Sequence, residues 1–417
     1  MSPLYILGLM VLISCAARPQ QIVPPEPTAP AAPANYLKPP SAARSEWSWT
    51  DAQGKVRTYL QTWDKLQKII DESGVSGLSL VLTQADSWLK NPDTYYFDFG
   101  FENPETRKPV DGSTVFPAGR LGQPVFGYLV LKLVDRGLFN IDQPLNEYLP
   151  KPLPDYPAYE DLKSDSRYKR LTARWVLTHR SGLANSRLTR PDGKLVFERS
   201  PGGYFGYSEE AYRLLQFVLE QKFGRSLNDL VKSVVFDFLA LREMGYVREP
   251  RFEGHLASVS AGAKETESES YVSSTFLTSA ADYSRFIWAV VVSGGAFSNP
   301  YIGLPYHYSQ TIVRSPTIFE SPRSSGRLDL PLGFGWSFGW GGYYIEGHKV
   351  TFVGDRRQGM ESYATVLVGL PGKITVLTML AVGSGERSVI GRILNEIVGD
   401  IDPPLVWLGF ENGEIKK

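Results

Sequence analysis

One pair of residues has a spacing that acyl-transfer enzymes use. Ser166 and Lys169 lie three residues apart, and on a helix this spacing places a nucleophilic hydroxyl beside a basic amine. The surrounding stretch is charged and lacks helical periodicity, so we interpret it as a solvated loop.

The residues that most often bind metals are few and scattered. The chain has one cysteine, Cys15, and four histidines at positions 179, 255, 307 and 348. Structural zinc sites use four such ligands at close spacing, so we expect no metal and no other cofactor. A single cysteine also excludes a disulfide within the chain.

The composition is typical of a folded protein with more than one structural unit. The chain has 417 residues, of which 42% are hydrophobic and 21% are charged, and this excludes a wholly disordered protein. Forty-four Lys and Arg residues balance forty-four Asp and Glu residues. A net charge of zero gives no overall attraction for nucleic acid or an anionic membrane, so we expect no nucleic-acid partner.

The N-terminus has the pattern of a lipid-modified signal. A short apolar run from Leu4 ends at Ser14-Cys15 and is too short to span a membrane. This end resembles the lipobox of bacterial lipoproteins, which implies that residues 1–15 form a signal peptide and that Cys15 carries the lipid. The departure is that no Lys or Arg precedes the apolar run. The alternative is an uncleaved apolar tail with a free thiol.

The segment after Cys15 favours a tether. The segment from Pro19 to Pro40 contains eight prolines, both ends included, and they predict an extended, solvated spacer within a linker of residues 16–50. The alternative is an ordinary disordered tail. The resemblance implies a lipid anchor in the bacterial cell envelope, with the folded part facing the periplasm. Ala16, rather than Asp, follows Cys15 and resembles the pattern of outer-membrane lipoproteins.

Hydrophobic periodicity predicts a mixed α+β fold. A helical stripe begins at Val56, and a buried helix is expected at 125–134. Further helices are expected at 212–223, 227–239 and 388–398, and strands at 78–83, 95–99, 363–369 and 373–381. This order predicts a sheet domain formed by residues 51–125 and 276–417, with a mainly helical domain of residues 126–275 inserted into it.

Five segments lie in the order of a known family. They are Phe116-Pro117-Ala118-Gly119, Leu177–Leu183 with its Thr178-His179-Arg180-Ser181-Gly182 centre, Pro201–Ser208 with Tyr207, Ser279–Phe286, and Phe334-Gly335-Trp336. Together they resemble the serine β-lactamase-like family of class C β-lactamases, D,D-carboxypeptidases and esterases, over roughly residues 55–400. The resemblance implies an antiparallel sheet flanked by helices, with an inserted helical domain.

The catalytic residues of this family are replaced in the sequence. The nucleophilic serine of the family falls on Arg120, and its lysine falls on Gln123. A guanidinium does not accept an acyl group, and a neutral amide is not a general base. Tyr207 of the second motif is kept, but Glu209 stands where the family has asparagine. Without a nearby lysine, the Tyr207 phenol is expected to stay protonated near neutral pH.

The third motif of the family, Lys or His followed two residues later by Gly, has two possible registers here. One register places His348 and Val350 at the motif positions, and the other places Val353 and Asp355 there. Neither register keeps the motif intact.

The two substitutions at positions 120 and 209 suggest a compensating pair. In the family fold these positions face each other, and a buried, unpaired arginine is costly. We therefore expect an ion pair between Arg120 and Glu209 that fills the space of an acylating substrate. The alternative is that both side chains point independently to solvent. His179 belongs to the family signature, and we expect it to be a structural histidine.

These observations predict a membrane-tethered envelope protein with an inactive site. Its expected role is to bind a peptidoglycan-type peptide, an acyl ligand or a protein partner. Aromatic residues either line a groove or pack in a hairpin near the third motif; they are Trp336, Phe338, Trp340, Tyr343 and Tyr344. Two alternatives stay open: an active serine hydrolase with an unrecognised nucleophile, and a purely structural lipoprotein.

Overall fold

The structure is a computed structural model, and it describes nine stretches of the chain: residues 43–86, 92–259, 270–293, 335–357, 359–369, 373–383, 388–401, 405–408 and 410. Cys15 and residues 16–42 lie outside these residues, as do His307 and Phe334. The linker was expected to extend to residue 50, but its last part is folded, because Ser48–Thr50 pairs as a strand with Val56–Thr58. Within them, no helix is both long enough and apolar enough to cross a membrane.

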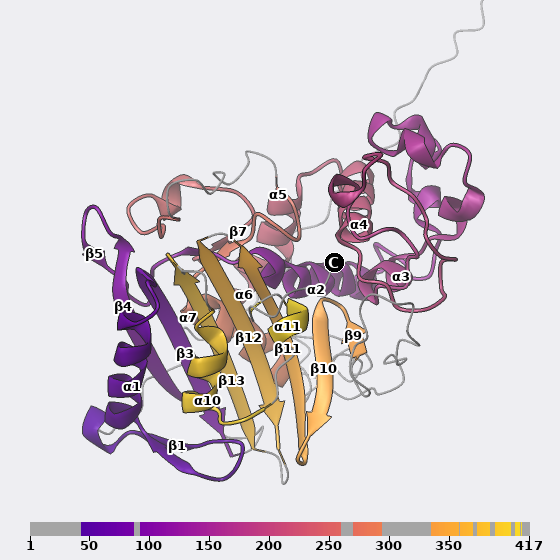
Figure 1. Ribbon diagram of the computed structural model, residues 1–417. Coiled ribbons are helices and arrows are strands. Elements are labelled where there is room, and N and C mark those ends of the chain that lie inside the picture. Colours follow the sequence, from indigo (N-terminus) through magenta and orange to yellow (C-terminus); the bar gives the residue numbers. More distant parts are fainter. Residues whose placement is uncertain are drawn as a thin grey trace, which may run out of the picture.

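The centre of the molecule is an antiparallel sheet with the strand order β5-β4-β3-β13-β12-β11-β10-β9 (Figure 1). The first and last parts of the described chain pair at its middle, where β13 lies against β3. The strands are β3 (Gly77–Ala85), β4 (Asp93–Asn103), β5 (Lys108–Pro109), β9 (Gly335–Ser337), β10 (Trp340–Ile345), β11 (His348–Arg357), β12 (Met360–Val368) and β13 (Ile374–Val382).

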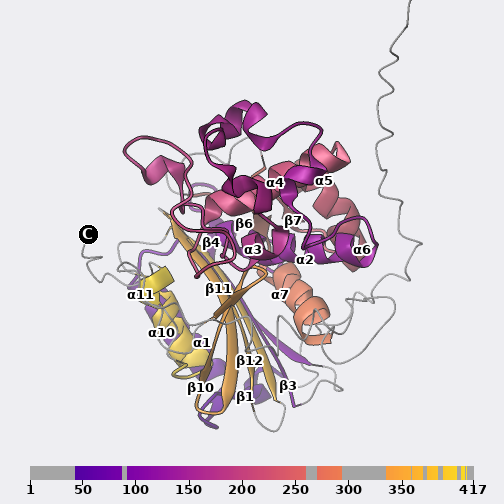
Figure 2. The ribbon, with the colours of Figure 1, turned by 90° about the vertical axis from the view of Figure 1, so that its right-hand side faces the viewer.

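Both faces of this sheet are covered. On one face lie α1 (Tyr59–Asp71), α10 (Ile390–Ile397) and the short α11 (Leu405–Leu408), together with the hairpin of β1 (Ser48–Thr50) and β2 (Val56–Thr58). On the other face lies α7 (Ala280–Ile287), which Figure 2 shows on the opposite side of the sheet from α1 and α10. Each face has its own hydrophobic core, because strands buried on both sides carry apolar residues in both directions.

A mainly helical region lies between β6 (Phe116–Pro117) and β8 (Leu277–Thr278). β8 pairs with β6 on one side and with β7 (Met244–Gly245) on the other, so the chain leaves and re-enters the sheet part at one place. The α-helices of this region are α2 (Gly122–Asp135), α3 (Ala173–Leu177), α4 (Glu209–Phe223), α5 (Leu227–Val231) and α6 (Asp237–Leu239). They stand above one end of the large sheet (Figure 2).

The expected α+β class is confirmed, and each predicted helix and strand overlaps elements of the same type, with predicted ends that run one or two residues past the element at 363–369, 373–381 and 388–398. One expectation was wrong at its start. The helical stripe was expected from Val56, but Val56 lies in β2 and is 65% exposed, and α1 begins only at Tyr59. Ser166 and Lys169 lie in a short, exposed 3-10 helix rather than a loop.

Candidate functional site

The candidate site forms where α2 begins. Arg120 lies in a short 3-10 helix, η2 (Gly119–Leu121), directly before α2. Gly119 has a positive φ of 48°, and a Cβ atom there would collide with the Asp355 carboxylate. Glycine at this position therefore allows β11 to bring a carboxylate against the start of α2.

The predicted ion pair between Arg120 and Glu209 is present. Arg120 Nε lies 2.8 Å from Glu209 Oε1, and each side chain is 29% exposed. Glu209 is the first residue of α4, whose N-cap Ser208 accepts the backbone N–H of Ala211. A carboxylate in the first turn also suits the positive end of this helix. The pair is thus half-buried and joins the start of α2 to the start of α4.

Asp355 is a second and more deeply buried partner of Arg120. Its side chain is 1% exposed, and its Oδ1 lies 3.6 Å from Arg120 Nη1. Its Oδ2 accepts the backbone N–H of Arg120 at 3.2 Å and the Nε–H of Arg357 at 2.8 Å. This carboxylate offsets the unfavourable placement of a cation at the N-terminal end of α2.

The surroundings keep Arg120 charged. Burial by itself lowers the pKa of the guanidinium, but Tyr207, Asp355 and Glu209 together raise that pKa above its ordinary value. The guanidinium carbon also lies 5.5 Å from the centre of the Tyr207 ring, within the range of a cation–π contact. A permanently charged group therefore stands at the start of α2.

Gln123 joins two hydroxyl groups beneath Arg120. Its Nε2 donates to the Tyr207 hydroxyl at 2.8 Å and to Ser273 Oγ at 2.9 Å. Burial raises the pKa of the Tyr207 phenol above its ordinary value, so the expected protonated phenol agrees with its surroundings. Because an amide donates to both oxygens and does not titrate, it cannot take a proton from either one.

His179 lies behind Tyr207 in a buried aromatic layer. The two ring centroids are 4.2 Å apart, and Trp336 lies 5.5 Å from each of them. The His179 Nδ1 atom accepts the backbone N–H of Ser208 at 3.2 Å, so the proton of the neutral ring is on Nε2. In the described part of the chain, Nε2 has no hydrogen-bond partner. The histidine packs as expected, but only one of its nitrogens is satisfied.

The structure brings Arg120, Gln123, Tyr207 and Glu209 together, but it places His348 elsewhere. His348 begins β11 and lines a small hollow beside Trp49. Asp355 follows seven residues later on the same strand, which corresponds to about 23 Å at the usual rise. The register that uses Asp355 therefore reaches the site, and the assignment of His348 to it was wrong.

The aromatic residues after residue 335 form a packed hairpin and no groove. Strands β9 and β10 pair as neighbours, and four of the aromatic side chains are buried: Trp336, Phe338, Trp340 and Tyr343. The side chain of Tyr344 lies outside the described residues. The turn between the strands packs on α2, since a Cβ at Gly339 would collide with the backbone at Gln123. The hairpin thus packs against the part of α2 that carries Gln123.

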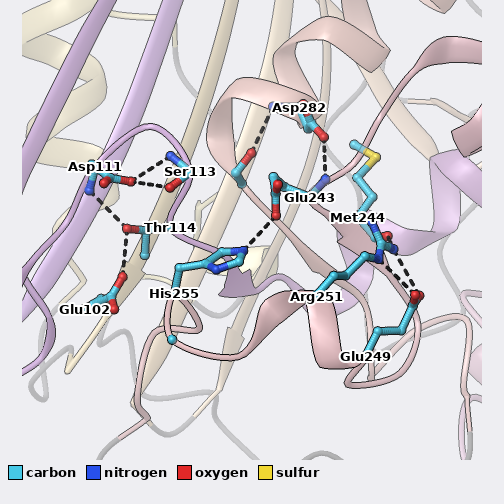
Figure 3. Close-up of polar contacts among 12 residues, drawn as sticks. Glu102, Asp111, Ser113, Thr114, Glu243, Met244, Glu249, Arg251, His255 and Asp282 are labelled. Atoms are coloured by element: carbon cyan, nitrogen blue, oxygen red, sulfur yellow. Dashed lines mark hydrogen bonds and ion pairs between the residues drawn. The ribbon is translucent and has the colours of Figure 1, made fainter.

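Polar residues also gather around the strands where the helical region joins the sheet (Figure 3). His255 Nε2 lies 2.9 Å from Glu243 Oε2, and Arg251 pairs with Glu249. Asp282 accepts the backbone N–H of Glu243, so these groups satisfy one another. Within the residues that the structure describes, no group of three or more His, Cys, Asp or Glu residues is placed to hold a metal ion.

Two residues of the site had no signal in the sequence analysis. Ser273 lies 150 positions from Gln123, its contact in the site. Arg357 lies two residues after Asp355 on β11, and the alternation of a strand puts both on one face once that register is known. The assembled site has fixed charges and hydrogen-bonding groups, with the Arg120 guanidinium and the Gln123 amide at its centre.

The comparisons with known proteins agree with this architecture. The sequence model of the family described as Beta-lactamase matches residues 64–387. Penicillin-binding protein 4* of Bacillus subtilis (strain 168) is 20% identical over 307 residues, which cover 62% of this chain and 64% of that relative. The chain therefore spans less than two thirds of the length of this relative.

Solved structures show the same fold. The octameric penicillin-binding protein homologue from Pyrococcus abyssi is 17% identical, with a TM-score of 0.60 over 84% of this chain and 77% of that chain. A class C beta-lactamase from Rhodobacter sphaeroides is 15% identical, with a TM-score of 0.59 over 80% of this chain and 97% of that chain. The family model covers more than half of the chain, and the chain belongs to the beta-lactamase family.

Proposed function

We propose that this protein is a membrane-tethered binding or scaffold module of the bacterial cell envelope that does not carry out acyl transfer. The observation that carries the proposal is the Arg120 side chain, which pairs with Glu209 and Asp355 and stands where the sequence resemblance predicts the nucleophile of the family. Gln123 replaces the base, so neither half of the nucleophile–base pair is present. The expected occupants are a peptidoglycan-type peptide, an acyl ligand or a protein partner.

Turnover measurements test the proposed inactivity. The full-length chain is expected to hydrolyse a chromogenic β-lactam, an aryl ester and a D-alanyl-D-alanine peptide no faster than buffer does. A cooperative melt of the same sample shows that the protein is folded. A rate that rises in proportion to protein concentration and survives further purification would overturn the proposal.

One observation bears on the alternative of an active hydrolase. Ser273 lies in the site and is buried, so its hydroxyl is a candidate replacement for the missing nucleophile. Its Oγ, however, accepts a hydrogen bond from the Gln123 amide, which is a donor and no base. A Ser273→Ala variant separates the two cases, since any genuine turnover that depends on this serine disappears with it.

The tether is a proposal that rests on the N-terminal sequence. Cys15 ends an apolar run and precedes the proline-rich spacer, which suits lipid attachment followed by a periplasm-facing domain. Ala16 after Cys15 favours the outer membrane. In a bacterial host, the wild-type chain is expected in the membrane fraction, and Cys15→Ala is expected to release it after cell disruption. Equal membrane association of both chains would contradict lipid attachment at Cys15.

A further inference from the structure

Two guanidinium groups of the site lie against the same buried carboxylate. Asp355 Oδ1 is 3.6 Å from Arg120 Nη1, and Asp355 Oδ2 is 2.8 Å from Arg357 Nε. The two arginines come from distant parts of the chain, one before α2 and one at the end of β11. Asp355 therefore holds two cations side by side at one place.

Each of these arginines has hydrogen-bond donors to spare. Arg120 donates through its backbone N–H and Nε, and among the described residues its Nη2 donates to no other group. Arg357 donates through Nε and through Nη2, which lies 2.7 Å from the Ser273 carbonyl oxygen, and no residue that the structure describes accepts from its Nη1. The side chains are 29% and 37% exposed, respectively. Solvent therefore reaches both, and a guanidinium offers donors in a fixed planar fork that suits a carboxylate.

Glu209 adds an acceptor beside Arg120. Its Oε1 takes the Arg120 Nε–H, and within the described chain no group donates to Oε2. Two arginines and two carboxylates give the site a side-chain charge of zero. The Glu209 carboxylate would repel a dianion. A ligand with one negative and one positive group matches the charges of the arginines and of Glu209.

We propose that Arg120, Arg357 and Glu209 bind a small zwitterion of the amino-acid type. Its carboxylate lies against the spare donors of the two arginines, and its ammonium group lies against Glu209 Oε2. Asp355 does not contact the ligand, because its side chain is buried, but it positions both arginines. This inference rests on the proposed function, since the ligand needs Arg120 in the place where an active relative has its nucleophile.

Calorimetric titration of the full-length chain with four probes tests the proposal. Glycine, which carries both charges, is expected to bind saturably. N-acetylglycine lacks the ammonium group and glycinamide lacks the carboxylate, so each is expected to bind about tenfold more weakly or worse. Inorganic phosphate is expected to show no saturable binding. Equal binding of glycine and N-acetylglycine, or tighter binding of phosphate, would overturn the proposal.

A pair of variants locates the binding. Arg357→Gln is expected to raise the dissociation constant of glycine about tenfold or more. Arg392→Gln, which removes an exposed arginine paired with Glu72, makes the same charge change and is expected to bind like wild type. Equal affinity of the two variants, or no saturable binding of glycine to folded wild-type chain, would refute the site. If the site is refuted but the chain shows no turnover, the proposed function still stands. Turnover would contradict the proposed function, whatever the result of the binding measurements.

Discussion

Replacing Asp355 with alanine is expected to lower the free energy of unfolding by about 3 kcal/mol. Asp355 is 1% exposed, and it contacts both Arg120 and Arg357. Its removal leaves two adjacent cations without their shared partner and an unsatisfied backbone N–H before α2. Stranding buried charges costs more than losing an exposed ion pair, so this is the most damaging single change that we expect in the site. Urea unfolding followed by tryptophan fluorescence measures it.

Glu209→Ala is the matched control, because it removes the other carboxylate that pairs with Arg120. This pair is 29% exposed on each side, and Arg120 keeps Asp355 after the change. The expected loss is only about 1 kcal/mol. Unfolding midpoints that are equal for the two variants would show that Asp355 does not anchor the arginines.

Lowering the pH is expected to destabilise the wild-type chain more than a His179→Asn variant. Burial foremost, and the Arg120 cation next, lower the pKa of His179 to about 3, against an ordinary value of 6.5. Because the pKa of His179 is lower in the folded chain than in the unfolded chain, the neutral imidazole favours the folded state. This contribution to the free energy of unfolding is complete above about pH 6.5 and is lost as the pH falls toward about pH 3. The slope from this one group is about 1.4 kcal/mol per pH unit. Protonation of Nδ1 would also remove the acceptor for the Ser208 N–H.

The measurement is a set of urea titrations between about pH 7 and about pH 4. Asparagine at position 179 has a side-chain oxygen that can accept the Ser208 N–H, but it does not titrate. His255→Gln is the reference variant, because it removes an imidazole that is more exposed than that of His179. The His255 side chain is 22% exposed and lies beside Glu243. If the stability of wild type and His179→Asn falls in parallel as the pH is lowered, the account of His179 is wrong.

Much of the fold follows from local sequence patterns. The run at 78–83 lies inside β3, the run at 373–381 lies inside β13 except for its first residue, and the apolar run at 125–134 lies inside α2. Periodicity failed at Val56, because the short strand β2 exists through its pairing with β1 rather than through its own pattern. Residues 56–58 fit a helical stripe equally well until that partner is known.

The site was predictable only where a family motif marked it. Arg120, Gln123, Tyr207 and Glu209 were found from motif positions, and their contacts confirm that these residues meet. His348 was misplaced because a local match says nothing about which end of a strand reaches the site. A buried serine 150 positions away from its partner leaves no local pattern, so Ser273 was found only in the structure.

The intact mass of the chain after labelling tests the central claim most directly. The claim is that Arg120 and Gln123 leave the site unable to form an acyl-enzyme. A full-length Cys15→Ala chain has no thiol left to react, and it is incubated with a fluorophosphonate and, separately, with a penicillin. The account predicts an unchanged mass for protein that melts cooperatively. One label per chain, traced by peptide mapping to Ser273 or another serine of the site, would contradict it.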